Sequence, residues 1–490
     1  MNAPNIITRR SFLTRTALLA GAGAGASTIR DMQLMNSLMA AQTPTDYKAL
    51  VCVFMGGGND ANNWIVPTDN TTHAEYSAIR GNLTLPVGSL LPLRTGPLPT
   101  DPLHTHGGRT YGFHPSGANL QTLFGEKKLA IVQNVGTLNR PTTRAQYLSG
   151  LAAYRPPQLF SHSDQVTQWQ TSIPDVPPTT GWYGRMADIY NAAANPSGNI
   201  SMSVSLNGAN TLQVGNLISQ YHVSTAGAVT LAGNHMTGSG ARVQAMRDIM
   251  ALTHPNLQRQ AYASVLDNAI FTGDLLNSNI QATAEAAQGG TWVWNTAFPT
   301  SSLGNQMKMI ARLIQASGPA GFNMKRQTFF CSTGGFDTHT AQVRRPNGTD
   351  DPTATDSTHY TLLADIANCM FAFQRAMEQI GFQDKVTQFT ASDFSRTFPT
   401  NSQGSDHGWG SHHIVVGGRV NGGNMFGHLP TFAINGPDDT GTGRWIPTLS
   451  VDQHAATIAK WYGLDSTEIG AILPNISRFP SNDLGFMKPA

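Results

Sequence analysis

The stretch Tyr47–Asn63, YKALVCVFMGGGNDANN, decides the fold class, because it joins an apolar run to a glycine-rich turn that ends at an acid. Residues 49–55 are apolar throughout, which predicts a parallel strand buried on both faces. The three glycines allow the chain to turn sharply, so Asp60 is expected to face a site beyond the end of this strand. The stretch therefore predicts a parallel sheet whose carboxyl edge carries functional groups.

The same arrangement recurs later along the chain. Further strand-like runs lie at 127–137, 325–333 and 385–392, and the last two are followed by Asp337 and Asp393. Helical patterns separate these runs, at 116–128, 181–194, 303–318, 360–381 and 451–464. Strands that alternate with helices predict an α/β fold, with a doubly wound, mostly parallel sheet and helices on both faces.

One segment does not follow this alternation. Residues 201–288 begin with short polar strand-like pieces and continue into a long helical run from Arg242. We interpret this segment as an insertion that caps the main domain. The predicted organisation is a single domain over 45–490, preceded by a signal segment over 1–41.

The signal segment has the order of an export signal. TRRSFLTRTALLAGAGAGA, residues 8–26, places paired arginines before a weakly apolar run that ends in small residues. This order resembles a twin-arginine signal, with cleavage after Ala26 or after Ala41. The segment predicts a periplasmic or secreted protein that meets the twin-arginine translocase, and no other window predicts an integral membrane span.

Composition excludes some partners. The 490-residue chain has a formal net charge of +2, and only 12% of its residues are charged. Because phosphate-backbone binding needs a concentrated basic face, we expect no nucleic-acid partner. The three cysteines, Cys52, Cys331 and Cys369, lie in apolar runs and are predicted to be buried thiols rather than disulfides.

Carboxylates and imidazoles cluster in two stretches after the predicted strands. GGFDTH places Asp337 and His339 two residues apart, so both can reach one ion if the chain is extended. Residues 391–418, ASDFSRTFPTNSQGSDHGWGSHHIVVGG, add five more candidate ligands, which are Asp393, Asp406, His407, His412 and His413. One of the adjacent pair His412 and His413 can equally point away from a site.

Together with Asp60, these residues predict a metal site. Mixed carboxylate and imidazole ligands are typical of zinc, manganese or iron, and the number of ligands is sufficient for one or two divalent ions, zinc or manganese above all. Two such ions can stabilise the attacking and leaving oxygens when a phosphate-type ester is hydrolysed.

A nucleophile is expected at a helix N-terminus, where backbone N–H groups favour an anion. NRPTTRAQY offers Thr142 or Thr143, with Arg140 and Arg144 nearby to hold a charged group, although an N-cap threonine explains the motif equally well. Three further polar side chains complete the candidates, with Arg396 as a catalytic residue and Ser161 and His162 as substrate contacts.

Taken together, the motifs resemble the bacterial exported family called domain of unknown function 1501, within the alkaline phosphatase and sulfatase superfamily. The resemblance rests on VFMGGGNDANNWIVP, LAIVQNVGTLNRPTTRAQY, LFSHSDQVTQWQ, GWYGRMAD, GGFDTHTAQ, ASDFSRTF, SDHGWGSHHIVVGG and WIPTLSVDQHAATIAKWYGL.

The superfamily implies a fold and a distribution of ligands. By analogy, Asp60, the threonine, Asp406 and His407 would form one metal site, and Asp337, His339 and His412 the other. The sequence departs from the superfamily pattern in the one-residue gap between Asp337 and His339, and it lacks the C/S-x-P-x-R sulfatase signature.

These observations favour an exported, metal-dependent hydrolase of phosphate or sulfate esters, acting on a small or polymeric substrate through a threonine nucleophile. Two alternatives stay open at this point. The chain could be a non-catalytic exported protein for binding or cell-surface assembly, or a carboxylesterase or sugar-modifying hydrolase that uses the same pocket without metal.

Overall fold

The computed structural model describes residues 43–93, 109–198, 200–228, 241–252, 256–283 and 294–489. The predicted signal segment and its cleavage sites lie outside these ranges.

A long sheet forms the centre of the molecule. Within the described ranges its strands follow the order β12-β5-β11-β10-β1-β9-β6-β7-β8, and β13 also pairs with β5. The strands are β1 Lys48–Met55, β5 Leu129–Gly136, β6 Ser203–Ser205, β7 Tyr221–Ser224, β8 Gly227–Ala228, β9 Arg326–Thr333, β10 Val386–Ser392, β11 Ser411–Val416, β12 Asn424–Phe426 and β13 Leu449–Ser450. A smaller antiparallel sheet contains β2 Ile65–Pro67, β3 Leu91–Leu93 and β4 Tyr111–Phe113.

β1, the first strand of the described residues, lies in the middle of this sheet. β1 pairs in parallel with β9 on one side and with β10 on the other, so that Val53 lies opposite both Cys331 and Thr390. β11 runs antiparallel to both of its neighbours, β10 and β5. The amino end of β11 therefore lies at the same edge as the carboxyl ends of β1, β5, β9 and β10.

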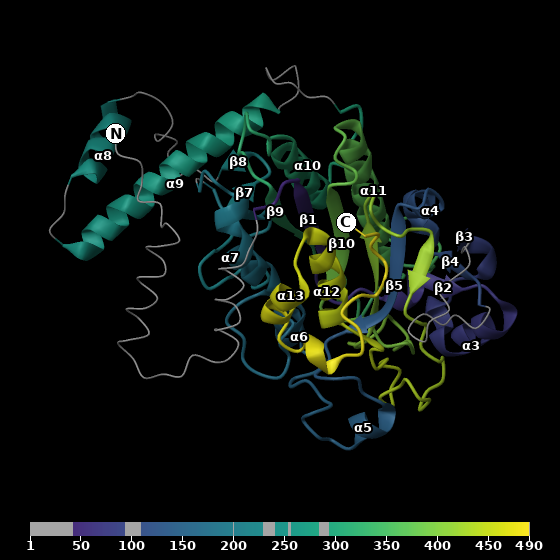
Figure 1. Ribbon diagram of the computed structural model, residues 1–490. Helices are drawn as coiled ribbons and strands as arrows, with labels where there is room; N and C mark the ends of the chain where they lie inside the picture. The colour runs from purple at the N-terminus through teal and green to yellow at the C-terminus, as the bar shows by residue number, and fades with distance from the viewer. Residues whose placement is uncertain are drawn as a thin grey trace.

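Helices cover both faces of the sheet (Figure 1). One face packs against α4 Ala118–Gly125, α10 Ser302–Gln315 and α11 Thr358–Gln379, and the other against α6 His162–Thr171, α7 Trp182–Ala194, α12 Val451–Tyr462 and α13 Ser466–Ile472. The remaining helices are α3 Asn70–Arg80, α5 Arg144–Leu148, α8 Ala241–Ala251 and α9 Leu257–Ala282. α8 and the start of α9 extend away from the sheet (Figure 1).

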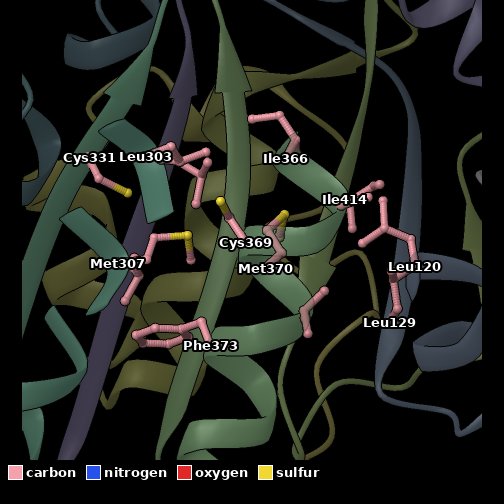
Figure 2. Packing of buried hydrophobic residues seen from close by; sticks show 14 of the residues in the cluster. Leu120, Leu129, Leu303, Met307, Cys331, Ile366, Cys369, Met370, Phe373 and Ile414 are labelled. Carbon is pink, nitrogen blue, oxygen red and sulfur yellow. The ribbon is translucent and has the colours of Figure 1, made fainter. Parts of the chain in front are cut away.

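The sequence pattern explains why these elements pack as they do. Every residue of β1, β5 and β10 is buried, as expected for strands covered on both faces. In the core between β9, α10 and α11, Met307, Cys331 and Cys369 lie close together (Figure 2). All three cysteines are free and buried, which confirms that prediction.

The predicted fold class is confirmed, because the sheet is mostly parallel and helices flank both of its faces. The predicted insertion has two parts with different positions. Its first part contains β6, which pairs in parallel with β9 and so continues the main sheet, whereas α8 and α9 lie outside the sheet. The boundaries of the domain and of a cap stay a prediction.

Candidate metal centre

Loops at the carboxyl edge of the sheet bring the predicted polar residues together. Asp337 and His339 follow β9, Asp393 follows β10, and His407 belongs to the loop that leads back into β11. His162 is the first residue of α6. The loop after β1 packs tightly among them, because a Cβ on Gly58, whose φ is +84°, would lie 2.4 Å from the ring of Phe394.

Three histidines at this edge share one hydrogen-bonding scheme. His162 Nδ1 lies 2.7 Å from Asp393 Oδ2, and His339 Nδ1 lies 2.9 Å from Asp406 Oδ1. His407 Nδ1 lies 2.7 Å from the carbonyl oxygen of Phe160. These partners accept hydrogen bonds, so each Nδ1 carries a proton, and in the neutral form of each imidazole the lone pair is then on Nε2.

The free Nε2 atoms converge on the carboxylate of Asp337. Asp337 Oδ1 lies 3.1 Å from His339 Nε2 and 3.3 Å from His407 Nε2, and Asp337 Oδ2 lies 3.5 Å from His162 Nε2. His162, Asp337 and His407 form a group whose possible ligand atoms all lie within 4.8 Å of one another. We call His162, Asp337, His339 and His407 the His–Asp cluster.

Two observations show that the His–Asp cluster suits a cation. The Nε2 atoms of His339 and His407 are only 2.8 Å apart, although the scheme gives both of them lone pairs that repel each other. His162 Nε2 is buried and has no hydrogen-bond partner in the described part of the chain. A cation among His162, Asp337 and His407 would accept the lone pairs of His162 Nε2 and His407 Nε2, and ligands of a tetrahedral zinc ion lie about 3.3 Å apart, given Zn–N distances of about 2.0–2.1 Å.

The environment of the cluster favours a neutral imidazole at His407 and an ionised carboxylate at Asp337. Burial lowers the pKa of His407, and the charge of Arg396 lowers it further, against the raising effect of the Phe160 carbonyl. Burial raises the pKa of Asp337, but the hydrogen bond and charge of Arg396 outweigh it, so that the pKa lies below its ordinary value. A neutral imidazole and an ionised carboxylate are the forms that bind a metal.

Arg396 is a buried residue that holds the Asp337 carboxylate. Its guanidinium is fully buried and donates from Nη1 to Asp337 Oδ1 at 2.7 Å and to the carbonyl oxygen of Gly57 at 3.2 Å. Nη2 donates to the carbonyl oxygen of Ser405. These contacts fit a residue that positions Asp337, whereas the sequence suggested a catalytic group.

Asp60 has a different environment from the one expected of a metal ligand. Its carboxylate is fully buried and forms an ion pair with Arg80, and it accepts hydrogen bonds from Gln342 and Asn62. Burial raises the pKa of Asp60, but Arg80 outweighs this effect and the pKa is lowered. Both carboxylate oxygens are thus already bonded to donors, and the predicted role of Asp60 as a ligand is not favoured.

Asp393 and Asp406 hold imidazoles in place. Asp393 is 4% exposed, and it accepts from the backbone N–H of Gly57 as well as from His162. Asp406 accepts from His339 and from the side-chain amide of Asn401. The sequence proposed both acids as metal ligands, and the structure gives both the position of acids that orient a ligand.

His412 and His413 lie within β11 and are buried. His412 Nδ1 accepts a hydrogen bond from the backbone N–H of Asn134 at 3.1 Å, and burial lowers the pKa of His412 to about 4. His413 packs against Trp169 and His454. Neither belongs to the His–Asp cluster, so the predicted ligand role of His412 is not favoured.

The candidate nucleophiles have other bonding partners. Thr143 is the N-cap of α5 and forms a capping box with Gln146, and its hydroxyl donates to Gln146 Oε1 at 3.1 Å. Thr142 donates to the carbonyl oxygen of Arg140 at 2.8 Å. For Thr143 the structure therefore shows the N-cap arrangement that the sequence left open, and the hydrogen bonds of both threonines in the described chain stay within their own loop and α5.

Three more predicted residues surround this loop. Arg144 donates to Asn435 Oδ1 at 3.0 Å, and the guanidinium of the exposed Arg140 lies 5.7 Å from the ring centroid of Tyr154. Ser161, next to His162, donates to Asp164 Oδ2 at 2.6 Å. Their predicted roles in substrate binding stay predictions.

Sequence reasoning missed two supporting groups, and it gave His162 a different role from the one its position favours. Arg80, the ion-pair partner of Asp60, lies at the end of α3, and Phe160 supplies a backbone carbonyl that no side-chain motif reveals. His162 was expected to contact substrate, but its Nε2 points toward the cluster. The order Ser-His-Ser-Asp at the start of α6 was the available signal for His162.

Comparisons with known proteins give one strong match. Residues 47–469 match the sequence model of the family described as a protein of unknown function, DUF1501. A search of curated proteins finds no match. None of the described helices has the length and apolar character needed to cross a membrane.

Solved structures show only a weak likeness. The crystal structure of Ps i-CgsB with k-i-k-neocarrahexaose is 8% identical, at 86% coverage of this chain and 74% of that chain, with a TM-score of 0.33. The PsFucS1 sulfatase from Pseudoalteromonas sp. is 10% identical, at 95% and 75% coverage, with a TM-score of 0.31. Similarity at this level says nothing about activity. The family match spans most of the chain, and the chain therefore belongs to the DUF1501 family of proteins of unknown function.

Proposed function

We propose that this protein is a metal-dependent hydrolase of phosphate or sulfate esters, with one divalent cation held by His162, Asp337, His339 and His407. The observation that carries the proposal is the convergence of three imidazole Nε2 atoms on one carboxylate. Each of these imidazoles is fixed through its other nitrogen, which is the arrangement of histidines that bind metals in proteins.

The cation would be zinc or manganese, because a shell of three imidazoles and one carboxylate suits these metals better than magnesium or calcium. A cation bound there would supply Lewis-acid chemistry for ester hydrolysis. The protein supplies the geometry. Asp393 and Asp406 hold two imidazoles, and Arg396 holds the Asp337 carboxylate.

The proposed nucleophile is water rather than a threonine. The hydroxyl of Thr143 is engaged with Gln146 in the capping box, and that of Thr142 bonds to the backbone of the same loop. In contrast, the cluster is open to solvent, because the Asp337 side chain is 46% exposed and that of His339 is 41% exposed. Water can therefore reach the side chains that would bind the cation.

Export is part of the same proposal. It is supported by the twin arginines Arg9 and Arg10 and the small-residue run that follows them. Replacement of both arginines by lysine should retain the protein in the cytoplasm, and cell fractionation with an antibody against the chain measures this.

The central experiment measures metal content and hydrolysis on the same protein. We expect about one zinc or manganese ion per chain, and chelator-sensitive activity on at least one member of a panel of phosphomonoesters, phosphodiesters and sulfate esters. Asp337→Asn and His407→Ala should each abolish stoichiometric metal binding. His222→Ala, which alters an exposed histidine of β7, is the matched control and should keep the metal.

Two results would contradict the proposal. Absence of bound metal in wild-type protein that was purified without chelators and then supplied with zinc or manganese would remove its basis. Stoichiometric metal without hydrolysis of any ester in the panel would instead favour the binding or assembly protein that the sequence also allowed.

A further inference from the structure

Arginines gather beside the His–Asp cluster, starting with Arg444. Its Nε donates to the carbonyl oxygen of His407 at 2.7 Å, and its guanidinium lies 4.3 Å from the ring centroid of Phe160. Phe160 also accepts the Nδ1 hydrogen bond of His407. Arg444 is thus attached to a cluster residue by one bond and to that residue's supporting partner by stacking.

Three more guanidinium groups lie on α5 and on the segments before and after it. Arg144 bonds to Asn435, which belongs to the same loop as Arg444. Arg155 lies 4.2 Å from the ring centroid of Tyr147, and Tyr147 packs against Trp409, two residues after His407. Arg140 lies over Tyr154. We call Arg140, Arg144, Arg155 and Arg444 the arginine rim.

The positive charge of the arginine rim is not neutralised by acids of the described chain. No acid occurs in the sequence between Glu126 and Asp164, and none of the four arginines forms an ion pair with a described acid. The nearest acids along the chain have other partners. Asp164 accepts from Ser161, Asp438 accepts from the backbone N–H of Thr431, and Asp439, five residues before Arg444, accepts from two backbone N–H groups.

Stacking on aromatic rings also has a consequence for binding. Arg140, Arg155 and Arg444 each lie over an aromatic ring, and a guanidinium held there loses less conformational freedom when it binds an anion through charge-assisted hydrogen bonds. The overall charge of +2 conceals this local excess, because the remaining charges are distributed over the chain.

We infer that the substrate is a polyanionic ester, which places one ester group at the His–Asp cluster and further sulfate or phosphate groups on the arginine rim. This inference rests on the proposed function, since it names the substrate class of that site. The arginine rim adds affinity and selectivity for substrates with several anionic groups. Arg444 adjoins the cluster, so it would bind the anionic group next to the reacting ester and favour substrates that carry such a group there.

Binding is tested on metal-free protein, so that the result does not depend on hydrolysis. The probes are dextran sulfate, uncharged dextran and inorganic sulfate, with affinity measured by calorimetry at two salt concentrations. Wild-type protein should bind dextran sulfate with an affinity that falls as salt rises. R140Q/R144Q/R155Q/R444Q should weaken that binding by about tenfold or more.

A charge-matched control lies at the opposite edge of the sheet. K127Q/K325Q/K385Q/R419Q removes the same number of positive charges from residues next to the amino ends of β5, β9 and β10 and the carboxyl end of β11. This variant should bind dextran sulfate like wild type. R140K/R144K/R155K/R444K, which keeps the charge, should recover part of the affinity and guards against a folding defect in the glutamine variant.

Three outcomes would overturn the inference. The first is that the rim variant and the opposite-edge variant lose the same affinity for dextran sulfate, and the second is that wild-type protein does not bind dextran sulfate. The third is that wild-type protein binds duplex DNA as tightly as dextran sulfate, which would make the rim a nucleic-acid surface. If dextran sulfate binds as expected but the protein holds no metal, the proposed hydrolysis fails while the polyanion surface stands.

Discussion

At the scale of single residues, Asp393 and Asp406 have the same task for different histidines. Each carboxylate accepts the Nδ1–H of one imidazole and thereby directs the Nε2 lone pair of that imidazole toward Asp337. An acid in this position raises the basicity of the imidazole and fixes its orientation. The two acids therefore orient two different histidines, although the sequence predicted both as metal ligands.

Asp393→Asn tests this role. The amide cannot carry the negative charge that holds His162, so we expect a 10- to 100-fold weaker affinity for zinc with the fold retained, because outer partners of metal ligands typically have effects of this size. Competition with a chromogenic chelator measures the affinity. Asp384→Asn, at the opposite edge of the sheet, is the control and should bind zinc like wild type. An unchanged affinity in Asp393→Asn would contradict the role.

His454 provides a test of buried charge away from the site. Its two ring nitrogens have no hydrogen-bond partner in the described chain, and burial lowers its pKa to about 3. The titratable neighbour that faces it is His413, whose pKa burial also lowers. Between about pH 6.5 and 3 the unfolded chain binds a proton at His454 that the folded chain does not, so stability falls as the pH falls through this window.

His454→Leu removes that proton uptake. From pH 7 to pH 5 the wild type should lose about 2 kcal/mol more unfolding free energy than this variant, since the unfolded pKa is about 6.5. Urea unfolding at the two pH values measures the difference. Equal losses in the two proteins would show that His454 accepts a proton in the folded state.

Part of the site was predictable at this scale, and part was not. Asp337, His339 and His407 could be found because glycine-rich turns and polar spacing mark strand ends. Asp60 fits the same pattern, yet its carboxylate is paired with Arg80, and the sequence contains no signal that pairs the end of α3 with the turn after β1. The position of His162 relative to Asp337 depends on the direction of α6. The hydrophobic periodicity of the sequence does not determine that direction.

At the scale of elements, the turn after β1 determines how closely the site loops approach. Gly58 has a φ of +84°, and a Cβ there would collide with the ring of Phe394. That ring packs against the imidazoles of both His162 and His407, at centroid distances of 4.8 Å. A side chain on this turn would therefore displace two cluster residues through one aromatic ring.

Gly58→Ala should lower the unfolding free energy by about 1–3 kcal/mol more than Gly348→Ala, because overpacking adds to backbone strain. Gly348 is the matched control, since its φ is +85° and a Cβ there would meet no atom within 4 Å. Denaturant unfolding measures both variants. Gly58→Ala should also weaken zinc binding, whereas Gly348→Ala should not, and equal effects would contradict the importance of the close approach.

The strands were more predictable than their order. Apolar runs revealed β1 and β5, because a strand buried on both faces often has few polar residues. β9 and β10 contain more polar residues, but they still lie within the predicted strand-like runs 325–333 and 385–392. β11 runs antiparallel to both of its neighbours, and nothing in its own composition indicates this direction. The sequence therefore located the loop 393–410 but did not show that both of its ends lie at one edge.

At the scale of the whole molecule, a bound cation would tie together distant parts of the chain. His162, His339 and His407 come from α6, the loop after β9 and the loop before β11, which the unfolded chain does not hold together. A ligand that binds only the folded state stabilises it, by about 2.7 kcal/mol at a free concentration of 100 times Kd.

Saturating zinc should therefore raise the midpoint of thermal unfolding of wild-type protein by several degrees, and a chelator should reverse the shift. Asp337→Asn should show little or no shift, because it lacks the carboxylate on which the imidazoles converge. Differential scanning calorimetry measures both. A shift of equal size in the variant would indicate that zinc binds at another site.

The central position of β1 also affects how the chain is made. β1 ends at Met55, but its two partners begin at Arg326 and Val386. At a synthesis rate of roughly 5–20 residues per second, the ribosome needs roughly 15–55 s to pass from the end of β1 to the start of β9. During that time the most apolar strand of the sheet has both edges unpaired. The nascent chain should therefore depend on chaperones until its C-terminal half emerges.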